Sequence, residues 1–162
     1  MVIVVMGPSG AGKSTVGALV ARHRGATFVD ADDFHPVENI AKMQAGVPLD
    51  ETDRVVWLER LAIAIDGYLA GDREVVLACS ALRAAHRRVL RRDPTRVVFV
   101  YLRAARATLD GRLRGRRGHF MSASLLDSQL AALEEPDDAI VVDAEPPVDD
   151  VVHAVELAVG RR

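Results

Sequence analysis

Hydrophobic residues in this chain gather in short uninterrupted runs, and longer stretches with helical spacing lie between them. The runs cover residues 2–6, 26–29, 75–79, 97–102 and 139–142. Runs of this kind are typical of strands that are buried on both faces of a parallel sheet. The helical stretches are expected at 15–22, 36–45, 53–70, 82–92, 104–115, 122–134 and 147–159. This alternation predicts βαβ units, and therefore one α/β domain over residues 1–162 with five parallel strands covered by helices.

The loop that follows the first run carries the clearest chemical signature. Residues 7–14 fit the pattern G-x-x-x-x-G-K-[ST] and lie between an expected strand and an expected helix. This context favours a phosphate-binding P-loop over an ordinary glycine-rich turn. Glycines let backbone N–H groups converge on phosphate oxygens at the N-terminus of a helix. The residues expected to hold the nucleotide here are Gly7, Ser9, Gly10, Ala11, Gly12, Lys13, Ser14 and Thr15.

Two side chains of this loop have expected roles in phosphoryl transfer. Lys13 is placed to reach the β- and γ-phosphates of ATP, and the Ser14 hydroxyl is placed to bind Mg²⁺. The end of the third strand carries Cys79 and Ser80, where many P-loop proteins have a carboxylate for the metal. We therefore expect the remaining protein contact to Mg²⁺ to come from Asp30 through water. The fold class that follows is a three-layer, P-loop kinase-like α/β fold.

Acidic residues follow the second expected strand. Asp30 and Asp32 are two residues apart, so on an extended segment their side chains would point the same way. The carboxyl ends of strands form the ligand-binding edge of an open α/β sheet. Phosphoryl transfer needs a group that positions or deprotonates the acceptor hydroxyl. Asp32 is the expected base and substrate clamp; the alternative is a solvated acidic turn that caps the helix after Pro36.

Composition narrows the possible functions. The chain has 162 residues, of which 49% are hydrophobic and 27% charged, and its net charge is −2. These values fit a globular protein and give no support for a nucleic-acid or membrane partner. The single cysteine, Cys79, excludes an intramolecular disulfide and a cysteine-based zinc cluster. No run approaches the ~20 apolar residues of a membrane span, and the N-terminus is unlike a signal peptide, so we expect a cytoplasmic protein.

Four further motifs carry a family resemblance. Residues 30–43 fit D-x-D-x-x-H-P-x-x-N-I-x-K-M, residues 46–58 fit G-x-P-L-x-x-x-D-R-x-x-W-L, residues 79–83 fit C-S-A-L-[KR], and residues 116–120 fit R-x-G-H-F. Over residues 1–143 the chain resembles the gluconokinases of the small P-loop sugar-acid kinase type. The resemblance implies ATP-dependent phosphorylation of D-gluconate to 6-phospho-D-gluconate with Mg²⁺, usually in a homodimer. It also implies a helical substrate-binding segment and a mobile lid.

The chemistry of gluconate matches the residue types in the substrate-binding segment, about 32–70, and in the motif at 79–83. A carboxylate is bound well by the planar guanidinium of arginine through two parallel hydrogen bonds. Hydroxyl groups are bound by carboxylate, amide, imidazole and hydroxyl side chains. The candidates for the carboxylate are Arg54 and Arg83, and those for the hydroxyls are Asp32, His35, Asn39 and Ser80.

Several of these basic residues have another interpretation. Arg54 could instead form an exposed ion pair with Asp50 or Glu51 near the start of its helix. Arg87 could reach the carboxylate, but it lies in a run of arginines and is expected on a solvated helix face. Lys42 is nearly as consistent with a surface lysine as with a substrate contact.

A basic loop follows the fourth strand and its helix, at about 112–121. Kinases of this class carry a lid here, and Arg116 would stabilise charge on the transferring phosphoryl group as an arginine finger does. Arg112 is expected to contact the nucleotide, and His119 the phosphate or substrate. The alternative is a solvated basic patch for an acidic partner.

Two other functions stay open from the sequence. A related small kinase would act on shikimate or another sugar acid, although the segment 35–43 fits the gluconate type better. A nucleotide-dependent switch would lack transferase activity, but a guanine-reading N-K-x-D segment is absent from the chain. Residues 143–147 are expected to contact the adenine ring, mostly through backbone groups.

Overall fold

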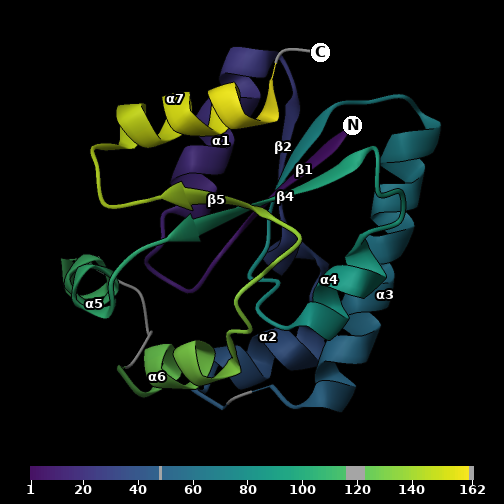
Figure 1. Ribbon diagram of the computed structural model, residues 1–162. Coiled ribbons are helices and arrows are strands. Elements are labelled where there is room, and N and C mark those ends of the chain that lie inside the picture. The colour runs from purple at the N-terminus through teal and green to yellow at the C-terminus, as the bar shows by residue number, and fades with distance from the viewer. Residues whose placement is uncertain (48, 116–122, 161–162) are drawn as a thin grey trace.

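A five-stranded parallel sheet forms the centre of the protein (Figure 1). The structure, a computed structural model, describes residues 1–47, 49–115 and 123–160. The strands follow the order β2-β3-β1-β4-β5 across the sheet, and each pairs with its neighbours in parallel. They are β1 (Val2–Met6), β2 (Thr27–Asp30), β3 (Val75–Ala78), β4 (Val97–Arg103) and β5 (Ile140–Asp143).

Helices occupy the segments between the strands. They are α1 (Lys13–Arg24), α2 (Val37–Gln44), α3 (Glu51–Ala70), α4 (Ala84–Leu90), α5 (Arg106–Gly115), α6 (Ala123–Ala132) and α7 (Val148–Val159). Each strand and helix expected from the hydrophobic pattern is present, with ends within about two residues of those expected. The predicted three-layer α/β fold is therefore confirmed. None of the helices, taken over the described residues, has the length and apolar character that a membrane crossing requires.

The expectation of an extended segment after β2 was wrong. Residues Ala31–Phe34 form a short 3₁₀ helix, η1, and the Asp30 side chain caps it by accepting a hydrogen bond from the backbone N–H of Asp32 at 3.1 Å. Aspartate competes well for backbone N–H groups in this way, which favours a turn over a continued strand. The side chains of Asp30 and Asp32 are consequently not related by the two-residue alternation of a strand.

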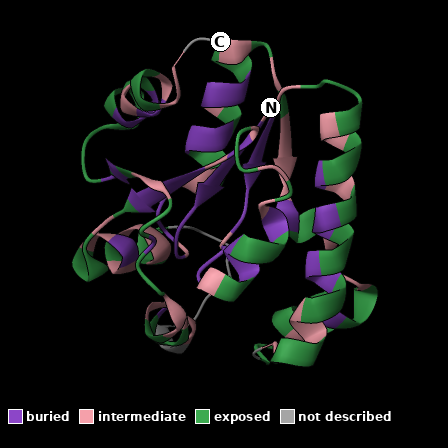
Figure 2. Cartoon of the chain, turned by 45° about the vertical axis from the view of Figure 1, so that its right-hand side comes forward, coloured by how far each residue is buried: buried purple, intermediate pink, exposed green. Residues whose placement is uncertain are grey.

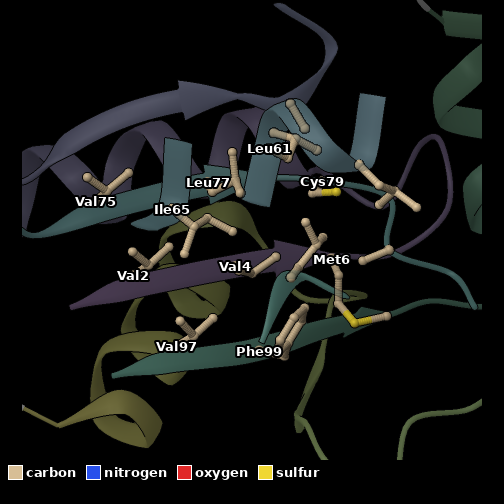
Figure 3. Packing of buried hydrophobic residues seen from close by; sticks show 14 of the residues in the cluster. Val2, Val4, Met6, Leu61, Ile65, Val75, Leu77, Cys79, Val97 and Phe99 are labelled. Carbon is tan, nitrogen blue, oxygen red and sulfur yellow. The ribbon is translucent and has the colours of Figure 1, made fainter. Parts of the chain in front are cut away.

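β1 is buried completely because helices cover both faces of the sheet. Val2, Val4 and Met6 pack against α3 and α4, in a cluster that includes Leu61 (Figure 3). The intervening Ile3 and Val5 pack in a second cluster with α1, α5, α6 and α7. Figure 2 shows the sheet largely buried and the outward residues of the helices exposed. This two-sided burial explains why the strand reads as an unbroken apolar run.

The parallel arrangement brings the carboxyl ends of the strands to one edge. β1 leads into the P-loop, β2 ends at Asp30, and β3 is followed by Cys79 and Ser80. β1 pairs with β3 and β4, so the P-loop lies at the middle of this edge. The fold thus places the sequence motifs next to one another.

Burial along α3 gives a test of the core. Leu61 is fully buried against β1, whereas Ile63 on the same helix is 72% exposed. Leu61→Ala should lower the free energy of unfolding by about 2–5 kcal/mol, since it leaves a cavity in the core. Ile63→Ala should change it by less than about 0.5 kcal/mol. Urea denaturation followed by circular dichroism measures both, and equal midpoints would contradict this description of the core.

Candidate active site

The backbone of the P-loop requires glycine at two of its turns. Gly10 and Gly12 have positive φ angles of 85° and 97°, a region that favours glycine. A Cβ at Gly10 would lie 2.8 Å from the carbonyl oxygen of Leu109, so the loop packs closely on α5. Gly12 is also the N-cap residue of α1, and it offers no side chain to the first N–H groups of that helix. The cradle therefore suits a phosphate group.

Polar groups of the loop have partners within the protein. The Lys13 ammonium donates to the carbonyl oxygen of Pro8 at 3.1 Å. The backbone N–H of Ser9 donates to Oε1 of Gln129, which lies on α6, at 2.7 Å. The Gln129 amide oxygen thus accepts from an N–H group of the kind that phosphate oxygens bind in P-loops. Gln129 has no recognisable signal in the sequence, because the contact joins residues 120 positions apart.

The oxygen atoms beside the loop fit a magnesium ion. The Ser14 hydroxyl donates to Oδ2 of Asp30 at 2.9 Å, which brings the two expected metal ligands together. Mg²⁺ prefers oxygen ligands and usually keeps several waters beside one or two protein groups and substrate phosphates. Among the residues described, no group of three or more His, Cys, Asp or Glu side chains could hold a metal by itself. Cys79 is no alternative ligand, because burial raises the pKa of its thiol to about 12.

A cavity of about 240 Å³ joins the P-loop to the substrate-binding segment. Its volume suits a small molecule bound in a partly enclosed site. The predicted site residues that line it are Ser9, Gly10, Gly12, Lys13, Ser14, Asp30, Asp32, His35, Arg54, Ser80 and Arg83. Residues far apart in the sequence therefore meet in one place, as the order of the strands requires.

His35 is held rigidly in the wall of this cavity. Its ring stacks on Trp57, with 4.7 Å between ring centroids and an interplanar angle of 8°. The Trp57 indole N–H in turn donates to the carbonyl oxygen of Ala31 at 2.8 Å. Burial, with a smaller effect from the charge of Arg54, lowers the pKa of His35 to about 4. The imidazole is therefore neutral near pH 7, and its Nε2 lies 3.8 Å from Oδ1 of Asp32.

Asn39 and Lys42 connect α2 to the start of α3. Asn39 is buried and donates from Nδ2 to the carbonyl oxygen of Asp53 at 2.8 Å. It is not among the residues that line the cavity, although it was expected to bind a substrate hydroxyl. Lys42 donates to both carboxylate oxygens of Asp53, at 2.6 and 2.8 Å. Asp53 also forms a capping box with Asp50, so these contacts fix the N-terminus of α3.

Two arginines and His86, a histidine whose pKa is lowered by burial, gather around Glu51 at this end of α3. Nη1 of Arg54 lies 2.7 Å from Oε1 of Glu51, and Nη1 of Arg83 lies 2.9 Å from the same oxygen. Nε2 of His86 lies 3.5 Å from Oε2. The ion pair that was the alternative for Arg54 is thus present, while Arg54 also lines the cavity. No motif pointed to Glu51 or His86.

Arg87 departs from its expected solvated position. It is only 2% exposed, and its guanidinium donates to the carbonyl oxygens of Ala81 and Leu82 at 3.2 and 3.1 Å. Its Nε lies 3.4 Å from a carboxylate oxygen of Asp138. Ala81 has a positive φ of 43°, so the turn after β3 is strained and needs such support. Arg87 holds the loop that carries Ser80 and Arg83, and the periodicity of a short helix could not reveal this.

A second hollow lies on the other side of the P-loop. It is lined by Gly10, Ala11, Gly12, Thr15, Val16, Arg112, Gly115, Ala144, Pro146, Val148 and Val151. Arg112 donates from Nη2 to the carbonyl oxygen of Ala144 at 2.7 Å, which joins α5 to the segment after β5. The segment expected near the adenine ring therefore borders the P-loop. Arg116, His119 and the rest of the expected lid after Gly115 lie outside the described residues.

Comparison with known proteins relates this site to a family. Residues 2–136 match a family model described as an AAA domain. A probable gluconokinase of Xenopus tropicalis is 39% identical, with 100% of this chain and 95% of that protein covered. The gluconokinase of Gluconobacter oxydans is 43% identical, with 84% of this chain and 76% of that protein covered.

Solved structures agree with these sequence comparisons. The crystal structure of a gluconokinase from Sinorhizobium meliloti 1021 superposes with a TM-score of 0.85 and 41% identity, over 96% of this chain and 89% of that one. Shikimate kinase from Aquifex aeolicus superposes with a TM-score of 0.61 and 21% identity, over 98% of this chain and 96% of that one. The second likeness establishes a shared fold alone. On the evidence of its sequence and its fold together, the chain belongs to the gluconokinase family.

Proposed function

We propose that this protein is a gluconokinase, which transfers the γ-phosphoryl group of ATP to D-gluconate and forms 6-phospho-D-gluconate. The observation that carries the proposal is the single cavity in which a P-loop, the Asp32 carboxylate and two guanidinium groups meet. Membership of the family supports it, since relatives that share about 40% of their residues with this chain are named gluconokinases.

In this proposal the P-loop and its neighbours bind the nucleotide. Backbone N–H groups and Lys13 hold the phosphates, Arg112 lies on the nucleotide side, and Ser14 with Asp30 holds Mg²⁺, the latter through water. The metal neutralises negative charge on the phosphate oxygens when it is bound. Supporting this assignment, Ser14 and Asp30 are already in hydrogen-bond contact.

Asp32 acts on the acceptor hydroxyl. Its side chain is 79% exposed and lines the cavity, so the carboxylate is accessible to a substrate. It orients the hydroxyl group and accepts its proton as the bond to phosphorus forms. Neutral His35 and Ser80 bind other hydroxyl groups of the acid. Asn39 lies outside the cavity and positions this wall through its hydrogen bond to the backbone of α3.

Arg54 and Arg83 bind the carboxylate of gluconate. Both guanidinium groups face the cavity, and both already contact a carboxylate, that of Glu51. The neutral state of His35 keeps a third positive charge away from the hydroxyl-binding wall. Arg116 and His119 retain their proposed roles at the phosphoryl group and the substrate. We also propose a homodimer in the cytoplasm.

The experiment that tests the function is an ADP-release assay with a panel of acceptors. D-Gluconate should give the highest kcat/KM, and shikimate, nucleoside monophosphates and water should give far less ADP. Faster turnover with shikimate would show that shikimate, and not gluconate, is the preferred substrate. If ADP is released at the same rate with and without an acceptor, the protein is a nucleotide hydrolase or switch and not a transferase.

Replacement of Lys13 tests the nucleotide site. Lys13→Ala removes a charge that meets the phosphates but removes no core volume, so kcat should fall by far more than tenfold, that is by more than about 1.4 kcal/mol of transition-state stabilisation. Steady-state kinetics measures the loss, and circular dichroism shows whether the fold persists. Arg22→Ala, at an exposed position of the same helix, is the control. A folded Lys13 variant that keeps more than a tenth of kcat would contradict the P-loop assignment.

Replacement of Asp32 tests the acceptor side. Asp32→Asn preserves the shape but loses the proton acceptor, so kcat should fall by about 10²–10⁴-fold while KM for ATP changes little. Asp33→Asn, the neighbouring exposed carboxylate outside the cavity, should behave like the wild type. If the Asp32 variant changes only KM for ATP, the residue belongs to the nucleotide site.

Replacement of Arg54 tests recognition of the acid. Arg54→Lys keeps the positive charge but loses the two-pronged geometry, so KM for gluconate should rise at least several-fold with KM for ATP unchanged. Arg88→Lys, at an exposed position of α4 outside the cavity, is the matched control. If the Arg54 variant has the same kinetics as the wild type, Arg54 only forms its ion pair with Glu51 and does not bind the substrate carboxylate.

A further inference from the structure

Glu51 does not itself line the cavity, but it pairs with two arginines that do. Its oxygen Oε1 contacts Arg54 and Arg83 at 2.7 and 2.9 Å, and these are the two guanidinium groups that the proposed function assigns to the acid. Burial opposes ionisation of Glu51, but its contacts with Arg54, Arg83 and His86 outweigh this and lower its pKa. The carboxylate is therefore ionised at neutral pH.

His86 supplies a second, independent sign of a ligand site. Its side chain is only 9% exposed and lines the cavity. Its Nε2 makes no hydrogen bond with the described part of the chain, because Oε2 of Glu51 remains 3.5 Å away. A buried polar atom without a partner is costly, and such atoms often face a ligand or water. His86 thus offers, beside the two guanidinium groups, a polar atom that has a 3.5 Å contact with Glu51 and no hydrogen bond in the described part of the chain.

The exposure of the four side chains indicates which of them can move. Glu51 is 57% exposed, whereas Arg54, Arg83 and His86 are 29%, 39% and 9% exposed. Exposed ion pairs contribute little stability, since water replaces them at small cost. Glu51 can therefore turn toward solvent while the three basic groups stay in the cavity wall.

We propose that Glu51 occupies the carboxylate subsite as an internal counter-ion that the acid substrate displaces, and that His86 is a further ligand of that subsite. This inference rests on the proposed function. An acid can exchange its own carboxylate for that of Glu51 on the two arginines. A neutral polyol cannot, because it would have to break the ion pairs without replacing the charge. Glu51 and His86 are then specificity-determining residues that favour acids over neutral sugars.

Two other roles for Glu51 make different predictions. An acidic residue in the first turn of a helix stabilises the helix dipole, and a purely structural Glu51 would affect stability without affecting substrate binding. A Glu51 that accepts a hydroxyl of the substrate would be needed for binding. Under our proposal its negative charge instead competes with the substrate. The sign of the change in gluconate affinity distinguishes all three.

The test compares gluconate binding in Glu51→Gln and the wild type, by calorimetry and by steady-state kinetics. The Glu51 variant should lower both Kd and KM for gluconate several-fold, with KM for ATP unchanged and with no tighter binding of neutral D-glucitol. Glu59→Gln, an exposed carboxylate on the same helix, is the matched control. Unchanged or weaker gluconate binding in the Glu51 variant would overturn the counter-ion role.

His86 is tested with a pair of variants. His86→Phe keeps the ring volume but removes the polar atom, and should raise KM for gluconate at least several-fold with a much smaller change in kcat. His86→Gln restores a donor and should recover part of the loss. Equal KM values in the wild type and a folded His86→Phe would overturn this ligand role. If the Phe variant does not fold, His86→Leu, which also removes the polar atom, takes its place, and an unchanged KM for gluconate in that variant would overturn the role.

Failure of this inference is distinguishable from failure of the proposed function. If the wild type phosphorylates gluconate and the variants behave as it does, only the inference is wrong. If the wild type prefers another carboxylic acid, the same variants measured with that acid decide the inference. If the wild type binds no carboxylic acid at all, both the proposed function and the inference are overturned.

Discussion

The burial of β1 on both faces and along both edges is the constraint on which the site depends. Its even-numbered residues pack against α3 and its odd-numbered residues against α1, while β3 and β4 saturate its backbone. A strand held in this way has a fixed end, so the P-loop that follows Met6 starts from a rigid point. Parallel pairing then brings Asp30 and Ser80 to the same edge of the sheet. The rigid core thus fixes the position of the P-loop groups that bind phosphate.

The opposite wall of the cavity is positioned by polar contacts in addition to the apolar packing of α3. Lys42, Asn39 and Asp50 converge on Asp53 and fix the start of α3. Buried Arg87 fixes the turn after β3 through backbone carbonyl groups. These hydrogen bonds restrain the start of α3 and the turn after β3, so removal of one partner should shift the cavity wall. These residues support the site without entering it.

The sequence predicted local structure well and tertiary contacts poorly, for a physical reason. Apolar runs and the glycine pattern depend on neighbours in the chain, so the strands, the helices and the P-loop were all identified. The stacking of Trp57 on His35 and the bond from Ser9 to Gln129 depend on which helix faces which loop. Arg87 appeared solvated because its neighbours are charged, yet one face of α4 lies on the sheet. The family motifs supplied Arg54 and Arg83, and the sequence offered Glu51 only as an ion-pair partner of Arg54, whereas His86 emerged from geometry alone.

The distribution of charge in the cavity favours one orientation of a bound acid. Carboxylates of Asp30 and Asp32 lie beside the P-loop, where a metal ion and phosphate groups would balance them, and guanidinium groups of Arg54 and Arg83 lie on α3 and after β3. A linear acid with one carboxylate can satisfy the arginines in only one orientation. Its other end, which bears a hydroxyl group, then faces Asp32 and the phosphates. Under the proposed function, transfer to the hydroxyl farthest from the carboxylate follows from this polarity, without a separate group to recognise that end.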